Sequence, residues 1–200
     1  MHRTDRRWGL LPSDGQVAVG LSGGTDSLAL VWLLVESNRR SAARRELVAL
    51  HVPVDAGGES APLPPATAAW CLELGVGVEE VRARLDPAES SLDCFACGRI
   101  RRRSLLEAAD ARGIRHLALG HHADDVVETW LMSLFYTGTA ETMAPVRSYF
   151  SGAVEVVRPL YEIQRGRLAR LARLAGFPPP ASACPLERSA RRERVAAALG

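Results

Sequence analysis

The sequence predicts an α/β protein built on a doubly wound sheet of five parallel strands. Short apolar runs that suit buried strands alternate along the chain with patterns that suit amphipathic helices. The chain has 200 residues, 47% of them hydrophobic, so it is long enough to bury one sizeable core. Two of the strands run into polar turns that open directly into a helix. Because ligands of such folds bind where parallel strands end, we expect the functional site at these turns.

The expected elements follow one another in a regular order within one domain, residues 1–200. Residues 1–13 are expected as a flexible lead, and residues 178–200 as a cysteine-bearing loop followed by an arginine-rich terminal helix. The five strands are predicted at 17–21, 46–54, 76–81, 114–120 and 153–157. The helices are predicted at 28–35, around 70–74, from residue 94, at 124–136, at 164–175 and at 186–199.

The first of the two turns has the composition of a phosphate-binding loop. It follows the first strand as Ser22-Gly23-Gly24-Thr25-Asp26-Ser27 and opens a helix. Adjacent glycines let backbone N–H groups approach an anion, the hydroxyl groups add donors, and the helix dipole favours negative charge. Asp26 would repel a bare phosphate, but it suits a divalent cation that bridges it to the phosphates. The plainer alternative is an ordinary turn in which serine and aspartate cap the helix.

The second turn, Gly120-His121-His122-Ala123-Asp124-Asp125, follows the fourth strand. If the first and fourth strands are neighbours, the two turns face each other at the switch point of the sheet. Asp124 and Asp125 stand at a helix start, where they are able to share a magnesium ion with a triphosphate. The alternative for these two residues is helix capping. One of the two histidines is expected to pack in the core or to donate a hydrogen bond to a nucleotide.

Composition excludes several classes of protein. All 25 basic residues are arginine, and the absence of lysine excludes a Walker-type P-loop and Schiff-base chemistry. Net charge is only +2, but arginines cluster locally and form either patches for a polyanion or solvated helix faces. No signal peptide or membrane-spanning run is predicted, so we expect a cytoplasmic protein that makes no membrane contact. In that compartment thiols stay reduced, so metal binding or catalysis is favoured over disulfide formation for its four cysteines.

Several motifs together resemble a known family. Residues 22–27 resemble the PP-loop of the ATP pyrophosphatase superfamily, in which a nucleotide is split between its α- and β-phosphates. The chain is similar to the tRNA 2-thiocytidine synthetase branch, the tRNA-cytidine 2-sulfurtransferases, in four further segments: Cys94-Phe95-Ala96-Cys97-Gly98-Arg99, the 120–125 turn, Arg158-Pro159-Leu160 and Cys184-Pro185. The resemblance implies a single PP-loop ATP-binding domain with an adenine nucleotide alpha hydrolase-like fold.

The resemblance also implies an activity and its partners. The enzyme would use ATP and Mg²⁺ to adenylate the C2 oxygen of a tRNA pyrimidine, cytidine in first place, and would replace that oxygen with sulfur. The expected partners are tRNA and a sulfur donor such as a cysteine desulfurase, with a homodimer as the candidate assembly. The residues assigned to ATP are Ser22, Gly23, Gly24, Thr25, Asp26, Ser27, His51, Gly120 and His121. The residues assigned to magnesium are Asp26, Asp124 and Asp125, and Asp125 is also a predicted catalytic residue.

Three of the cysteines suit an iron–sulfur site. Cys94 and Cys97 lie two residues apart at a helix start, where thiolates are favoured, and Cys184 adds a third thiol from another segment. Three thiolates fall one short of a closed zinc site but suit a [4Fe–4S] cube with one open iron. In the family that iron is thought to carry the transferred sulfide, so all three are predicted catalytic residues. A redox dithiol or a persulfide carrier is the alternative, and Cys71 is expected in the core.

Arg101 completes the predicted catalytic set. Helical phasing places Arg99, Arg102 and Arg103 on one arc and Arg101 on the other side, with Ser104 and Leu105. The related enzymes carry an important basic residue at the position of Arg101, so we expect it to stabilise charge, the alternative being a surface arginine.

The chain departs from the family pattern, and these departures leave other functions open. Thr25 stands where relatives carry lysine, and Cys184 lacks the nearby second cysteine of some relatives. The chain is also shorter than typical members at both ends. The alternatives are a lysidine-synthetase-like ligase, a PP-loop sulfurtransferase acting on a small molecule, a two-metal phosphoesterase and a non-catalytic nucleotide-binding module.

Overall fold

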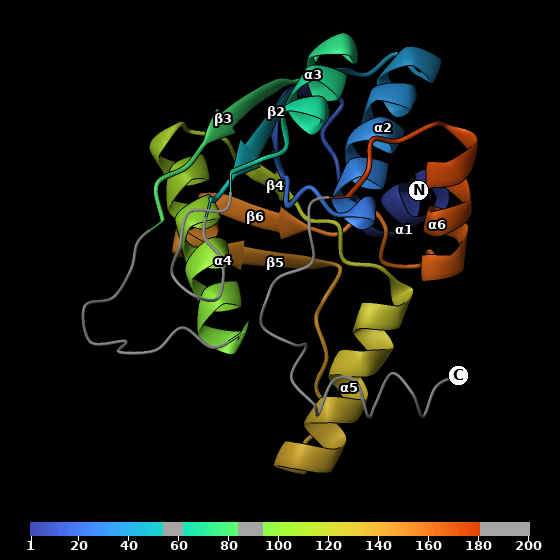
Figure 1. The fold of residues 1–200 in the computed structure, drawn as a ribbon. Coiled ribbons are helices and arrows are strands. Elements are labelled where there is room, and N and C mark those ends of the chain that lie inside the picture. The colour runs from blue at the N-terminus through green and yellow to red at the C-terminus, as the bar shows by residue number, and fades with distance from the viewer. Residues whose placement is uncertain (54–61, 84–93, 181–200) are drawn as a thin grey trace.

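The computed structural model describes residues 1–53, 62–83 and 94–180, apart from the side chains of residues 94 and 95 (Figure 1). The helices are α1 (His2–Trp8), α2 (Thr25–Arg40), α3 (Pro65–Glu73), α4 (Cys94–Ala111), α5 (Ala123–Thr137) and α6 (Arg165–Leu174), with a short 3₁₀ turn at Phe150–Gly152. The strands are β1 (Asp14–Gly20), β2 (Arg44–His51), β3 (Gly77–Glu80), β4 (His116–Ala118), β5 (Val146–Tyr149) and β6 (Val154–Val157). The terminal helix predicted at 186–199 lies outside the described residues.

The strands form one sheet in the order β3-β2-β1-β4-β6-β5. The pairs from β3 to β6 are parallel, so the predicted doubly wound α/β fold is confirmed, and β1 and β4 are neighbours as expected. The predicted number of five strands is wrong, because β5 adds a sixth strand that runs antiparallel to β6. With four residues, of which Arg147 and Ser148 are exposed, β5 lacks the apolar pattern of a strand. Its pairing with β6 makes it one.

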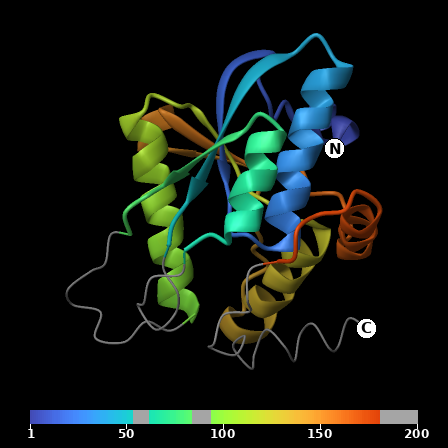
Figure 2. The ribbon, with the colours of Figure 1, turned by 45° about the horizontal axis from the view of Figure 1, so that its top comes forward.

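Helices cover both faces of the sheet and create two apolar cores (Figure 2). Side chains alternate between the faces along β1, so Val17 and Val19 enter one core and Ala18 enters the other. The first core packs the sheet against α2, α3 and α6 and includes Cys71, which is fully buried as predicted. The second core packs the sheet against α4. The carboxyl ends of the parallel strands therefore open between two helical layers.

The expected flexible lead at residues 1–13 is wrong. Residues 2–8 form α1, and Leu10 is fully buried in the first core. Glu162, in the segment after β6, accepts hydrogen bonds from Thr4 Oγ1 at 3.4 Å and from Trp8 Nε1 at 3.3 Å. The sequence of this segment is mostly polar, and only Leu10, with Met1 and Leu11 partly buried against the core, and a few hydrogen bonds hold it in place.

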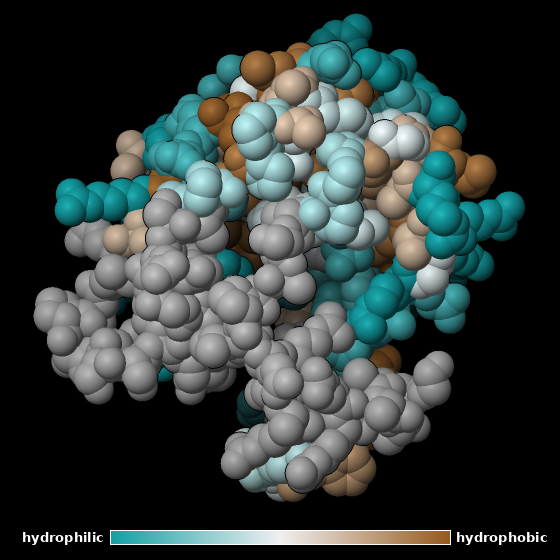
Figure 3. Space-filling view, in the orientation of Figure 1, coloured by the Kyte–Doolittle hydropathy of each residue, from teal (hydrophilic) through white to brown (hydrophobic). Residues whose placement is uncertain are grey.

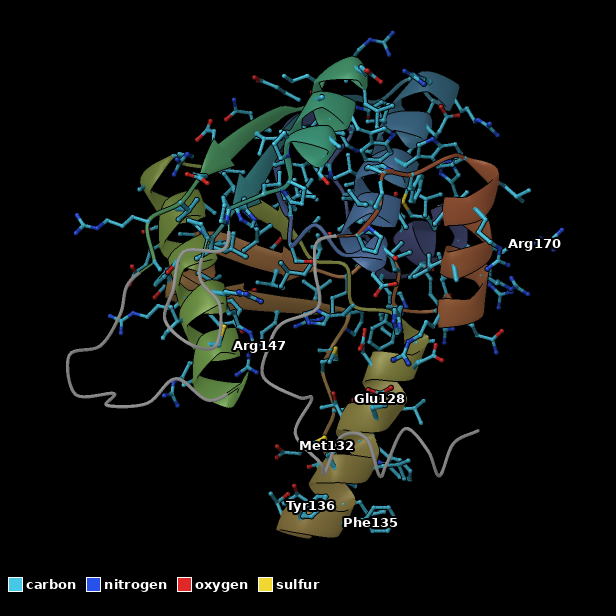
Figure 4. All side chains as sticks on the ribbon, viewed as in Figure 1. Glu128, Met132, Phe135, Tyr136, Arg147 and Arg170 are labelled. Atoms are coloured by element: carbon cyan, nitrogen blue, oxygen red, sulfur yellow. The ribbon has the colours of Figure 1, made fainter. Side chains whose placement is uncertain are left out.

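Helix α5 projects from the body of the molecule, as Figure 1 shows. Figure 4 labels Glu128 near the body and Phe135 and Tyr136 toward the free end, where Figure 3 shows hydrophobic and weakly hydrophilic residues side by side. Of the side chains of α5 only Glu128 is buried, and the apolar Val127, Trp130 and Leu134 are exposed. Within the part of the chain that the structure describes, no helix is both long and apolar enough to cross a membrane.

Candidate functional site

The loop between β1 and α2 has the shape of an anion cradle. Gly23 has a φ of 78°, in the left-handed region that glycine adopts without strain. Ser22 Oγ accepts a hydrogen bond from Gly24 N–H at 3.3 Å and donates to Ser27 Oγ at 3.2 Å. Ser27 Oγ donates in turn to the carbonyl oxygen of Gly24 at 2.8 Å. These bonds close the loop on itself and hold the first turn of α2 beneath it.

The N-terminus of α2 is available for an anion, whereas that of α5 is not. Gly24 caps α2 without any side-chain hydrogen bond from the cap, so the cap leaves amides of the first turn open to a ligand. Helix α5 instead begins with a capping box: Asp125 N–H donates to His122 Nδ1 at 3.4 Å, and His122 N–H donates to Asp125 Oδ2 at 3.0 Å. The helix dipole and amide donors at this edge therefore favour an anion at α2.

The β4–α5 turn lies directly against the start of α2. A Cβ atom built on Gly120 would lie 3.1 Å from both the carbonyl carbon and oxygen of Asp26, and 3.2 Å from Ser27 N. A Cβ on Gly20 would come within 2.7 Å of Leu119 Cδ2. The absence of side chains at these glycines lets two loops that lie far apart in sequence meet. The prediction that the two turns face each other is thus confirmed by the packing.

His122 is buried among three carboxylates. Its side chain is 1% exposed, its Nε2 lies 3.6 Å from Asp26 Oδ2, and its Nδ1 lies 3.6 Å from Asp124 Oδ2 and 3.3 Å from Asp125 Oδ2. The ring therefore links the anion cradle to the start of α5.

These surroundings raise the pKa of His122 above that of a free histidine. Burial lowers the pKa, but the hydrogen bond to Asp26 and the negative charges of Asp125 and Asp26 raise it by more. The positive charge of Arg165 acts in the opposite direction and lowers the pKa. The net direction of the pKa is upward.

The two acids at the start of α5 both have structural partners, and the helix-capping alternative is correct for Asp125. Asp124 Oδ2 accepts the backbone N–H of Arg165 at 2.8 Å and thereby holds the start of α6. The side chains of Asp26 and Asp124 are 40% and 37% exposed, whereas that of Asp125 is 18% exposed. Asp26 and Asp124 are therefore better placed than Asp125 to reach a metal ion from solvent.

Arg165 and Glu128 belong to this site, and the sequence analysis missed both. Arg165 Nη2 donates to Glu128 Oε1 at 2.7 Å, and its Nε lies 3.4 Å from His122 Nε2. The side chain of Glu128 is only 3% exposed, so this ion pair is largely shielded from water on the glutamate side. Two signals were available: Glu128 interrupts an apolar stretch of α5, and Arg165 begins α6, where the helix dipole disfavours a cation.

The two histidines assigned to ATP, His51 and His121, lie at the same edge. His51, at the end of β2, is buried, and its Nδ1 lies 2.8 Å from the carbonyl oxygen of Leu21. His51 therefore supports the first turn from below. His121 is half-buried and directly precedes the capping residue of α5. Their contact with a nucleotide stays a prediction.

The predicted sulfur site is only partly described. Cys94 and Cys97 occupy the first turn of α4, and Cys97 is buried in the second core. The side chain of Cys94 and all of Cys184 lie outside the described residues. Arg101 is half-buried; Arg102 and Arg103 are exposed, whereas Ser104 and Leu105 are buried, and the role of Arg101 stays a prediction.

The described residues suit magnesium only if substrate phosphates and water supply most of its ligands. Within residues 1–53, 62–83 and 94–180 no group of three histidine, cysteine or acidic side chains is arranged to hold a metal ion. Magnesium commonly keeps several waters and binds through one or two carboxylates together with substrate phosphates. Asp26 beside the uncapped loop fits that mode, with Asp124 on the far side of the His122 ring.

Comparisons with known proteins agree with this geometry. The model of the PP-loop domain family matches residues 5–178. The tRNA-cytidine(32) 2-sulfurtransferase of Geobacter sulfurreducens is 34% identical over 186 residues, which cover 90% of this chain and 71% of the relative. The same-named protein of Syntrophotalea carbinolica is 33% identical over 92% of this chain and 73% of its own length.

A solved structure is also similar. The U34-tRNA thiolase NcsA from Methanococcus maripaludis, solved with its [4Fe-4S] cluster, has a TM-score of 0.76 and 26% identity. The match covers 98% of this chain and 69% of that protein. Other curated relatives are longer, and the chain spans 63% of the one from Alkalilimnicola ehrlichii.

The fold and the loop at α2 define the class: the chain belongs to the PP-loop domain family. Within that family it belongs to the branch of the tRNA-cytidine 2-sulfurtransferases, a group of tRNA thiolation enzymes.

Proposed function

We propose that this chain is an ATP-dependent sulfurtransferase that adenylates the C2 oxygen of a tRNA pyrimidine, cytidine in first place, and replaces it with sulfur. The observation that carries the proposal is the uncapped, self-bonded loop at α2, which meets Asp26 and the His122 turn at the carboxyl edge of the sheet. The similarity to tRNA-cytidine(32) 2-sulfurtransferases supplies the substrate class.

In the first step, the C2 oxygen of the base attacks the α-phosphorus of ATP. A new oxygen–phosphorus bond forms, the bond to the bridging oxygen breaks, and pyrophosphate leaves with its electron pair. Ser22, Gly23, Gly24 and Ser27 would hold the leaving group through backbone and hydroxyl donors. Asp26, with Asp124 or Asp125, would hold Mg²⁺, which offsets the charge of the phosphates when bound.

In the second step, sulfide attacks C2, a carbon–sulfur bond forms, the carbon–oxygen bond breaks, and AMP leaves. Cys94, Cys97 and Cys184 would retain the sulfide beside the activated base, with Arg101 stabilising the developing charge. A [4Fe–4S] cluster on these cysteines would supply an open iron for the sulfide. A persulfide on one of the cysteines is the alternative carrier: its outer sulfur would attack C2 and displace AMP, and the thiolate of a second cysteine would then attack the inner sulfur, form a disulfide and release the thiocarbonyl. The proposal includes a cysteine desulfurase as donor, with a thiol reductant that brings its persulfide sulfur to the sulfide level, a cytoplasmic location and a homodimer.

Single replacements of cysteine by alanine test the sulfur-delivery role. C94A, C97A and C184A should abolish tRNA thiolation, measured by mass spectrometry of digested tRNA after anaerobic assay, while ATP affinity changes by less than about twofold. Cys71 supplies the matched control because it is fully buried in the first core and burial raises its pKa to about 11.

C71A should therefore thiolate tRNA at the rate of the wild type, once its lower stability is allowed for by assaying well below its melting temperature. Thiolation that persists in C94A, C97A or C184A would contradict sulfur delivery by these residues. Failure of the wild type to bind bulk tRNA would favour a small-molecule substrate instead.

A further inference from the structure

A basic site, distinct from the nucleotide loop, lies on the opposite face of the sheet from α2. Arg158 follows β6 and is only 4% exposed. Its Nη1 donates to the carbonyl oxygen of Ala144 at 2.6 Å, and its buried Nε has no hydrogen-bond acceptor among the described residues. A buried guanidinium with an unused donor is costly unless a further acceptor is supplied.

Two more arginines share this face of the sheet. Arg147 of β5 is in register with Val156 of β6, which belongs to the second core beside α4. Side chains alternate along a strand, so Arg158, two residues after Val156, lies on this same face. Arg102 belongs to α4, the helix that covers this face. Figure 4 shows Arg147 on the α4 side of the molecule.

Among the described residues, no carboxylate forms an ion pair with the three arginines, Arg102, Arg147 and Arg158. The pKa of Arg158 is lowered to about 10, chiefly by burial; Tyr149 raises it, and the charges of Arg102 and Arg147 contribute to the lowering. The positive charges of Arg102 and Arg147 thus both act on Arg158.

Aromatic side chains accompany the arginines. The guanidinium of Arg147 lies 5.6 Å from the ring centre of Tyr149, which packs against the second core. Tyr161 is close enough to raise the pKa of Arg158. Guanidinium forks match phosphate oxygens, and aromatic rings beside them suit unstacked bases. This combination favours a nucleic-acid backbone over an isolated small anion.

We propose that Arg102, Arg147 and Arg158 form a subsite for a backbone phosphate of the RNA substrate. The inference rests on the proposed function, and it assigns the RNA to the face covered by α4, the helix that also carries Cys97, while the nucleotide loop lies at the start of α2. The base would thus enter between the two helical layers at the carboxyl edge of the sheet.

Paired substitutions of equal charge test this subsite. R102Q/R147Q removes the two exposed arginines and spares Arg158, whose loss would also remove the contact with Ala144. R167Q/R170Q removes two exposed arginines from α6, which lies on the other side of the molecule in Figure 4. Each double variant lowers the net charge by the same amount.

The measurement is the affinity for a tRNA transcript as a function of salt concentration. R102Q/R147Q should bind at least about tenfold more weakly, with a salt slope smaller by about one, whereas R167Q/R170Q should bind like the wild type. ATP affinity should be unchanged in both. R102K/R147K, which keeps the charge, should recover part of the lost affinity.

The outcomes separate this inference from the proposed function. Equal weakening of RNA binding by the two double variants would overturn the subsite alone. A wild-type chain that binds no tRNA would overturn the RNA function and the subsite together. If inorganic phosphate binds to the wild type but not to R102Q/R147Q, and the two proteins bind RNA equally well, the three arginines form a small-anion site. That result would overturn the subsite for RNA.

Discussion

At the scale of single residues, Gly120 decides whether the two site loops can meet. Any side chain there would press on the carbonyl group of Asp26 and on Ser27 N, which belong to backbone and not to a flexible side-chain tip. Because the first turn of α2 carries the amides of the anion cradle, a side chain at position 120 would displace the backbone of the predicted phosphate site. The glycine thus couples packing to ligand binding.

Replacing Gly120 by alanine should lower stability and weaken ATP binding. Overpacking of this kind costs about 1–3 kcal/mol in the free energy of unfolding, measured by urea denaturation. G166A in α6 is the control, because a Cβ there meets nothing within 4 Å and alanine favours a helix. A G120A protein with unchanged ATP affinity would show that the two loops are not mechanically coupled.

At the scale of elements, short strands are joined by charged pairs at their edges. β4 has three residues and β6 has four, and His116 is in register with Glu155. Glu155 accepts a hydrogen bond from Arg115 Nη2 at 3.0 Å and lies 3.6 Å from His116 Nε2. Burial lowers the pKa of His116, Glu155 raises it and Arg115 lowers it, and the net direction is downward.

The lowered pKa of His116 predicts a loss of stability in mild acid. Above the ordinary histidine pKa of about 6.5, His116 is neutral in both states and contributes no pH dependence. Below it, the unfolded state binds the proton first, so stability falls as the pH falls toward the folded pKa, by at most about 1.4 kcal/mol per pH unit. In urea denaturation between about pH 7 and about pH 5, the free energy of unfolding of H116Q should depend less on pH than that of the wild type.

His2, exposed on α1, supplies the control for that measurement. H2Q should retain the pH profile of the wild type. A profile of H116Q that matches the wild type would contradict the assignment of the acid-sensitive window to His116.

At the scale of the whole molecule, the predicted nucleotide site joins segments from most of the chain. The loop after β1, the turn after β4 and the start of α6 meet at His122, and Arg165 links the last two through Asp124 and Glu128. A ligand that binds there contacts elements on which the entire sheet depends. Its binding energy should therefore appear as global stability.

A non-hydrolysable ATP analogue with Mg²⁺ should raise the free energy of unfolding by about 2.7 kcal/mol at about one hundred times its Kd, measured by urea denaturation followed by circular dichroism. EDTA should reduce this gain in the wild type but not in D26N, because D26N already lacks the proposed metal carboxylate. D110N, at an exposed acid on α4, is the control. An EDTA effect of equal size in D26N and D110N would contradict metal binding by Asp26.

Much of the fold and of the two loops could be predicted from local sequence. Glycine spacing and apolar runs predicted the strand-turn-helix units around the turns at residues 22–27 and 120–125, because each unit is formed by residues that are adjacent in sequence. The same reasoning failed for β5 and α1. Their sequences are polar and short, and only pairing with β6 or contact with Glu162 makes them regular.

The sequence by itself determined the doubly wound class, the two turns and the buried place of Cys71, since each depends on residues close together in the chain. Only the tertiary structure decided that His122 lies among three carboxylates, that Arg165 pairs with Glu128, and that Arg158 shares a face with Arg147. The pairs His122–Asp26, Arg165–Glu128 and Arg158–Arg147 each join residues of different elements. Their partners are set by strand order and by which face of the sheet each side chain occupies, and local patterns do not encode either one.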